Sequence, residues 1–94
     1  MPIFILLSTL TQQGVQTLKS NPERLRQVNK DVEELGARVL QQWATLGEFD
    51  FVNVVEAPDV ATMAKLSVAL GARGSIRIET LPALEIEEFL HTLE

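Results

Sequence analysis

The chain has 94 residues, of which 46% are hydrophobic, and it carries a formal net charge of −5 at pH 7. A chain of this length builds one domain with a modest core, and its apolar content excludes intrinsic disorder. The acidic balance argues against nucleic-acid binding, which normally requires a cationic surface. The absence of cysteine excludes disulfides and thiolate chemistry. It fits a reducing cytosol, so we expect a cytoplasmic protein.

Residues 3–10 form the first predicted element, a buried strand, because apolar and β-branched side chains dominate the segment IFILLSTL. The apolar run is too short for a membrane span and lacks the basic flank of a signal peptide. We therefore expect no association with membranes.

Two helices are predicted after this strand. Thr11 can cap a short helix over residues 12–19, and Asn21 followed by Pro22 is typical of the start of another. The second helix carries one apolar stripe, formed by Leu25, Val28, Val32 and Leu35. Gly36 follows this stripe and suits the left-handed residue that ends many helices.

The segment LGEFDFVNVVEAPD indicates a β-hairpin. Residues 37–46 and 49–56 are predicted strands, and the turn Gly47-Glu48 joins them. Asp50 lies just after this turn, where an aspartate commonly accepts hydrogen bonds from backbone N–H groups and holds the loop in shape.

The length of the turn determines which side chains share a face of the sheet. With two residues in the turn, Trp43 lies opposite Val52 on one face, and Gln42 lies opposite Asn53 on the other. The face of Gln42 and Asn53 also carries Ala44, Phe51 and Val55.

The last part of the chain is predicted to form a helix, a strand and a short helix. Asp59 caps the helix over residues 60–70, and the strand over residues 75–81 follows the loop of residues 71–74. The apolar face of the first helix consists of Met63, Leu66 and Leu70. The final helix begins near residue 85 with acidic residues, which suit the positive end of its dipole. We expect it to dock through Phe89, Leu90 and Leu93.

The order of these elements predicts one α+β domain over residues 1–94, with the ferredoxin-like βαββαβ arrangement and a C-terminal helix. Its four-stranded antiparallel sheet would carry helices on one face. The second face is also apolar, because the two longest apolar runs do not alternate with polar residues. We expect a second copy to cover it in a homodimeric α/β barrel, with Phe51, Val55 and Gln42 in the interface. The alternative is a monomer whose C-terminal helix folds over this face.

The segments LTQQGVQTLKSNPERLRQV, LGEFDFVNVVEAPD and IRIETLPAL resemble the GYD domain family of small bacterial and archaeal proteins, within the dimeric α/β-barrel superfamily. The resemblance covers nearly the whole chain and is most specific in the hairpin. Gly47 and Asp50 match the family's Gly, Tyr and Asp, whereas Phe49 stands at the tyrosine position. A role for that hydroxyl is therefore not carried over. The resemblance implies the fold and a homo-oligomer but no particular reaction.

A weaker resemblance points to a ligand. Residues 47–51, 58–59 and 76–80 are similar to the effector-binding half of Lrp/AsnC-type transcription regulators, which bind amino acids at subunit interfaces. The chain has no helix-turn-helix half. The similarity therefore implies that a small molecule is bound, and not DNA.

Four residues are candidates for contacts with such a ligand: Trp43, Asp50, Asn53 and Arg77. Trp43 and Asn53 could line an apolar pocket with few polar groups, and Arg77 could grip a carboxylate. Each also has a structural alternative. Trp43 suits an interface or core anchor, and Asp50 suits a turn. Asn53 could instead pair across the strands, and Arg77 could pair with Glu79.

The sequence contains few residues that could act as catalytic groups. His91 is the only histidine, and with Glu87 it offers two metal ligands, too few for a specific site. The chain has no cysteine, no tyrosine and no residues placed for a nucleophilic triad. We therefore expect no cofactor and predict a non-enzymatic, small-ligand-binding or regulatory module that acts as a homo-oligomer. The alternative, an analogy from the fold alone, is a cofactor-independent, monooxygenase-like enzyme for an apolar small molecule.

Overall fold

The computed structural model describes residues 1–94. The elements in chain order are β1 (Ile3–Leu10), α1 (Gln12–Ser20), α2 (Arg24–Glu34), β2 (Arg38–Ala44), β3 (Phe51–Glu56), α3 (Val60–Gly71), β4 (Ile76–Ala83) and α4 (Ile86–Thr92). The strands form one antiparallel sheet in the order β2-β3-β1-β4. This confirms the predicted α+β, ferredoxin-like arrangement with a C-terminal helix.

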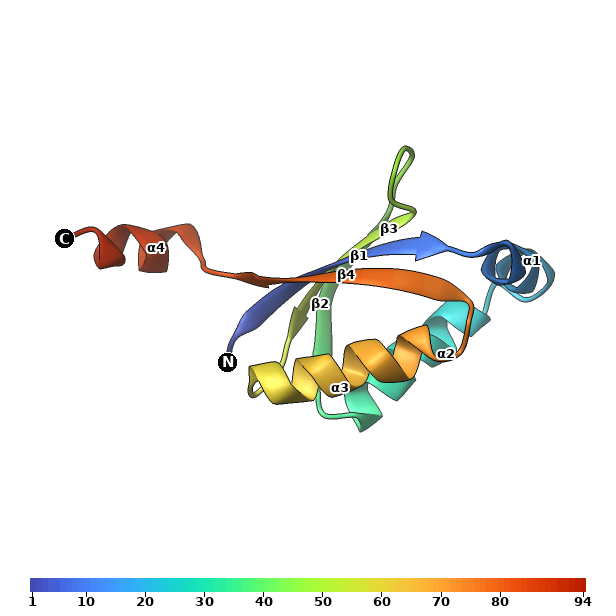
Figure 1. Ribbon diagram of the computed structural model, residues 1–94, viewed down its shortest axis with the longest axis horizontal. Coiled ribbons are helices and arrows are strands. Elements are labelled where there is room, and N and C mark those ends of the chain that lie inside the picture. Colours follow the sequence, from blue (N-terminus) through green and yellow to red (C-terminus); the bar gives the residue numbers. More distant parts are fainter.

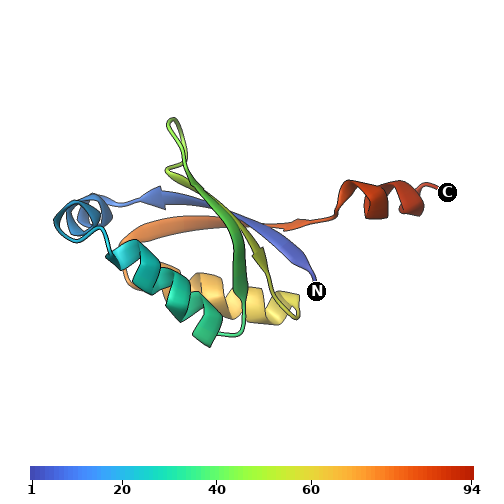
Figure 2. The same ribbon diagram turned by 180° about the vertical axis from the view of Figure 1, so that it is seen from behind.

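The helices are distributed unevenly around the sheet. Helices α2 and α3 lie against the same face, and α1 lies beyond the end of β1 (Figures 1 and 2). Helix α4 extends away from the opposite end of the sheet, and the molecule measures 51 × 29 × 18 Å. One face of the sheet is therefore covered by helices, and the other is not.

The core lies between the covered face and the helices. Strands β1 and β3 turn alternate side chains into it, so that Phe4, Leu6 and Val55 are buried next to Val32 of α2. Helix α3 contributes the predicted stripe of Met63, Leu66 and Leu70, all of them buried. Helical periodicity therefore identified the buried side of α3 correctly.

Two predicted helix caps and one predicted helix end are confirmed. The Gly14 N–H donates to Thr11 Oγ1 at 3.1 Å, and the Thr62 N–H donates to Asp59 Oδ1 at 2.7 Å. Gly36 follows α2 with a φ of 97°, a backbone conformation that side-chain-bearing residues rarely adopt.

The predicted start of the second helix is wrong. Asn21 ends α1, where its N–H donates to Thr17 O at 2.9 Å, and α2 begins at Arg24. The Asn21 carbonyl accepts the Arg24 N–H at 3.1 Å and so closes a turn that contains Pro22. The pair Asn21-Pro22 thus forms the connection between two helices and not the first turn of one.

The hairpin has the predicted register from Gln41 to Ala44, with a longer turn, and an irregularity between Val39 and Gln41 shifts the pairing farther from the turn. Gln42 lies opposite Asn53, and Trp43 lies opposite Val52. Strand β2 ends at Ala44 and β3 begins at Phe51, so the connecting loop covers residues 45–50. An even number of loop residues leaves the division of side chains between the two faces unchanged, so the register next to the loop was predictable even though the length of the turn was not.

The prediction of which face the helices leave open is wrong. Phe51 is 9% exposed and Val55 is 1% exposed, both on the covered face, and Gln42 hydrogen-bonds with Asn29 of α2. These residues cannot meet a second copy while α2 and α3 are in place. The open face is the one that carries Trp43. Strand β3 has apolar residues on both of its faces, so its composition does not show which face the helices cover.

The prediction that the final helix docks onto the body is also wrong. Phe89, Leu90 and Leu93 are 44%, 46% and 69% exposed. Ala83 at the end of β4 pairs with Ile3 at the beginning of β1, so the chain leaves the sheet at its edge. Neither the sheet nor another helix lies beneath α4 (Figure 1).

Candidate functional site

A cavity of about 100 Å³ lies between the covered face of the sheet and the helices. Residues of β1, β3 and β4 form its floor, and residues of α1 and α2 form much of its roof. Most of the wall is apolar, with contributions from Leu6, Leu10, Leu25, Val28 and Ile76. An apolar cavity with few polar groups is the usual form of a small-molecule site.

Asn53 is the polar residue of β3 that lines this cavity. Its side chain is buried, with 8% of the residue exposed, and its Oδ1 has no hydrogen-bond partner. Nearly all buried polar groups have a partner, and an unsatisfied one costs about 1–3 kcal/mol. Ser8 of β1, which is 4% exposed, adds a hydroxyl group to the same wall.

Two other amides of the cavity wall satisfy each other. Asn29 Nδ2 donates to Gln42 Oε1 at 2.9 Å, and Gln42 Nε2 donates to Asn29 Oδ1 at 3.2 Å. This reciprocal pair joins α2 to β2. Gln42 is thereby held by the helix, and the cross-strand pair with Asn53 does not form.

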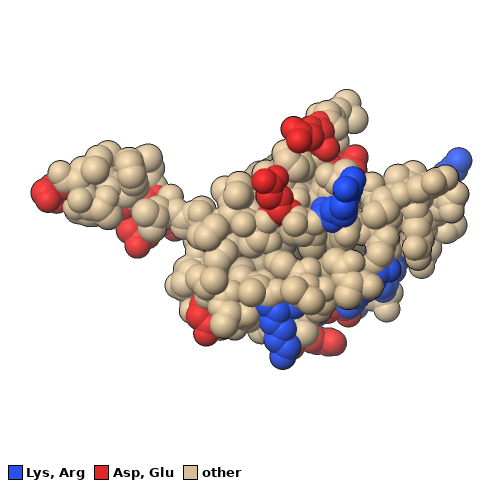
Figure 3. Space-filling view, in the orientation of Figure 1, with Lys and Arg blue, Asp and Glu red and all other residues tan.

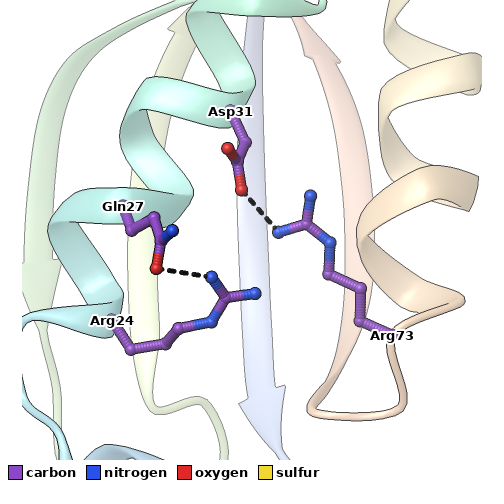
Figure 4. A network of polar contacts seen from close by, with 4 residues as sticks. All are labelled: Arg24, Gln27, Asp31 and Arg73. Carbon is purple, nitrogen blue, oxygen red and sulfur yellow. Dashed lines mark hydrogen bonds and ion pairs between the residues drawn. The ribbon is translucent and has the colours of Figure 1, made fainter.

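Two arginines also line the cavity, on the side where α2 approaches the loop after α3 (Figure 4). Arg73 forms an ion pair with Asp31 at 2.8 Å, and the two side chains are 34% and 26% exposed. Arg24 hydrogen-bonds to the neutral amide of Gln27 at 2.9 Å and has no carboxylate partner. The positive charge of Arg24 is therefore not neutralised by the protein.

The open face of the sheet is a second apolar surface. Its centre consists of Ile5, Leu7, Val52, Val54 and Trp43, which lie next to one another across β1, β3 and β2. Trp43 is 48% exposed. A shallow hollow beside Leu7, Phe49 and Arg77 lies at the margin of this face. Phe49, which departs from the Gly-Tyr-Asp pattern, thus lines a hollow that also contains the polar residues Thr9, Arg77 and Glu79.

The four candidate ligand residues do not form one site. Asn53 lines the cavity, whereas Trp43 and Arg77 are exposed residues of β2 and β4, the two edge strands of the sheet. Asp50 Oδ2 accepts the Leu10 N–H at 2.8 Å, which is the loop-stabilising alternative for this residue.

Sequence reasoning did not select the other polar residues that line the cavity: Ser8, Thr17, Arg24, Asn29, Arg73 and Ser75. A signal existed for one of them. Asn29 stands four residues after Leu25 and three before Val32, so it occupies a position of the apolar stripe of α2. A polar residue in an apolar stripe indicates a buried partner or a cavity.

No group of three or more His, Cys, Asp and Glu side chains is arranged to hold a metal ion. His91 lies 3.3 Å from Glu94, and both side chains are more than 70% exposed. Among the helices, none combines the length and the apolar character needed to cross a bilayer.

A ferredoxin-like sheet with an apolar cavity on one face and an apolar open surface on the other defines a small α+β domain. The chain matches the model of the GYD domain over residues 4–93, and it belongs to that family. It is 48% identical over 95 residues to a protein of Thermus thermophilus named "Glutamine synthetase and cystathionine beta-lyase binding protein", with 100% of both chains covered. The comparison with solved structures gave no significant match.

Proposed function

We propose that this protein is a non-enzymatic regulatory module that binds a metabolic enzyme, with glutamine synthetase and cystathionine β-lyase as the first candidates. The observation that carries the proposal is the 48% identity to the Thermus protein over 100% of both chains. No segment of either chain lies outside the match, so no partner-binding segment of the relative is missing here. A cytoplasmic location is part of the proposal, because a regulator must share the compartment of its enzyme.

Helix α4 is the surface that best suits contact with an enzyme. Its apolar residues recur at the spacing of one helix face: Ile86, Phe89, Leu90 and Leu93, each at least 44% exposed. A helix this short gains its stability from burial of such a face, and helices of this kind dock into apolar grooves. Glu87 and Glu88 flank the face, and α4 has no lysine or arginine (Figure 3). The complementary groove should therefore have a basic rim.

The open face of the sheet supports the second part of the proposal, a homo-oligomer. Monomeric proteins rarely expose contiguous apolar patches of this kind, and two such faces can pack against each other as in a β-sandwich. A second copy supplies a surface of the same twist. Around a two-fold axis, the exposed Arg77 and Glu79 of one copy can pair with Glu79 and Arg77 of the other.

The test of enzyme binding uses the full-length protein and both enzymes from the same organism. Biolayer interferometry measures the affinity of the protein for each enzyme. We expect saturable binding to at least one enzyme, weakened by salt because charges rim the contact. The double substitution Phe89→Ala with Leu90→Ala should weaken binding about tenfold or more, as loss of anchor residues does. Val68→Ala, at an α3 residue that is 72% exposed, is the control and should have no effect. Failure of the unsubstituted protein to bind either enzyme would overturn the proposal.

The apolar cavity also favours a second candidate, a cofactor-independent enzyme acting on an apolar small molecule. The two candidates differ in the fate of the ligand. A regulator releases its ligand unchanged, whereas an enzyme converts it. Mass spectrometry of ligands recovered after incubation with the protein under air separates them.

A further inference from the structure

We propose that the cavity between the sheet and helices α1 and α2 binds a small, branched aliphatic carboxylic acid that also carries a hydroxyl group. In this arrangement, the aliphatic part occupies the apolar cavity, the hydroxyl group hydrogen-bonds with Asn53, and the carboxylate pairs with Arg24. The inference deepens the proposed regulatory function and rests on it only in naming the acid as the regulatory signal. Binding itself requires no enzyme.

The size and lining of the cavity set the apolar part of the ligand. The volume of about 100 Å³ is smaller than the roughly 150 Å³ of an engineered apolar cavity that accommodates benzene. An aliphatic group of a few carbon atoms therefore matches its size. The side chains of Leu6, Val28 and Ile76 offer aliphatic contacts to such a group.

The unpartnered Oδ1 of Asn53 sets the first polar contact. The other two amides of the cavity wall, those of Asn29 and Gln42, are already engaged with each other. No protein donor reaches Asn53 Oδ1, although only 8% of the residue is exposed. A ligand hydroxyl group is both a donor and an acceptor, so it satisfies this amide in either orientation of its O and N atoms.

The difference between the two arginines sets the second polar contact. The charge of Arg73 is balanced by Asp31 at 2.8 Å, whereas that of Arg24 is balanced by no carboxylate. Both side chains line the cavity, and Figure 4 shows the Arg24 guanidinium directed toward the gap between α2 and Arg73. An arginine in this state binds a carboxylate through two parallel hydrogen bonds.

The experiment titrates the full-length, ¹⁵N-labelled protein with three probes: 2-hydroxyisovalerate, isovalerate and isobutanol. The second probe lacks the hydroxyl group and the third lacks the carboxylate. We expect saturable NMR shifts of the Asn53 side-chain amide and of Arg24 Nε with 2-hydroxyisovalerate. Each missing group should weaken binding about tenfold, as expected when one hydrogen-bonded group is lost.

Three variants assign the contacts. Asn53→Leu and Arg24→Gln should each weaken 2-hydroxyisovalerate binding about tenfold or more. Arg26→Gln is the matched control, because the Arg26 side chain is 80% exposed and pairs with Glu23, the residue that precedes α2. Asn53→Leu should also keep or raise the melting temperature, since it removes a buried oxygen that has no partner.

Two results would overturn the proposal. The first is the absence of saturable shifts at Asn53 with all three probes, which leaves ordered water as its partner. The second is equal binding by the Arg24→Gln and Arg26→Gln variants. The enzyme-binding assay is independent of both results. If the acid binds and the enzymes do not, the cavity site stands and the proposed function fails. If the enzymes bind and the acid does not, the proposed function stands and the cavity site fails.

Discussion

The two faces of the sheet are built from alternate residues of the same strands. Unexpectedly, polar residues lie on the face that the helices cover, and apolar residues lie at the centre of the open face. On the central strands β1 and β3, the covered face includes the polar residues Ser8 and Asn53, both buried. The open face carries the apolar residues Ile5, Leu7, Val52 and Val54 at its centre, and the polar residues Thr9 and Glu56 lie toward the ends of these strands. A covered face that retains polar groups next to a cavity is typical of a ligand site. An open face without polar groups at its centre is typical of an assembly surface.

The largest difference between the faces should appear when adjacent leucines of β1 are shortened. Leu6→Ala removes a side chain that is 4% exposed from the core and should lower the free energy of unfolding by about 2–5 kcal/mol. Leu7→Ala, on the open face, should cost about 1 kcal/mol at concentrations where the chain is monomeric. Urea unfolding of both variants measures the difference. Equal losses would mean that the two faces are equally buried in the monomer, which contradicts the comparison.

The role of the open face in assembly can be tested with a buried charge. We expect light scattering to give a mass near twice 10.4 kDa for the unsubstituted protein. Val54→Lys should reduce it to a single chain, because desolvating an unpaired ammonium costs several kcal/mol. Val68→Lys introduces the same charge on the exposed side of α3 and should leave the mass unchanged. A mass near 10.4 kDa for the unsubstituted protein would refute self-association through this face.

The hairpin loop, which maintains the register and so the identity of both faces, depends on Asp50. Asp50→Ala removes the acceptor of the Leu10 N–H at 2.8 Å and should cost about 1.5–3 kcal/mol, the range for hydrogen bonds to charged groups. Glu48→Ala changes an exposed carboxylate of the same loop and should cost almost nothing. Thermal unfolding compares the two. A neutral Asp50→Ala would assign Asp50 a role other than holding the loop.

The smallest effect should come from the cap of α3, one of the two helices that cover the inner face. Hydrogen bonds from the side chain and the backbone N–H of Thr62 lower the pKa of Asp59 below its usual value of 3.8. The stability that this carboxylate contributes is therefore fully present above about pH 3.8 and is lost as pH falls through the lower, folded-state pKa.

Asp59→Ala should accordingly lower the melting temperature at neutral pH, and the difference from the unsubstituted protein should shrink in strong acid. Asp59→Asn keeps a capping oxygen without the charge, so its smaller deficit should change little with pH. A deficit of Asp59→Ala that does not depend on pH would show that the cap acts without its charge.

Most features that depend on residues close together in the sequence were predicted correctly, whereas several features that depend on contacts between distant elements were not. The stripe of Met63, Leu66 and Leu70 and the caps at Thr11 and Asp59 are local patterns, and the structure confirms them. The register of the hairpin from Gln41 to Ala44 also followed from the even number of residues in the loop. Asn53 was selected as a ligand contact, yet its unpartnered oxygen and its place with Arg24 in the cavity wall depend on residues from several elements.

The sequence by itself thus determined the elements, their order and the division of each strand into two sets of side chains. Periodicity encodes these features within a few residues. Only the tertiary structure decided that Phe51 and Val55 face the helices, and that α4 leaves the body unsupported. The handedness of the crossovers places the helices on one side of the sheet. Which set of side chains points to that side depends on the phase of the pleat, and residues that are apolar on both faces leave that phase unspecified.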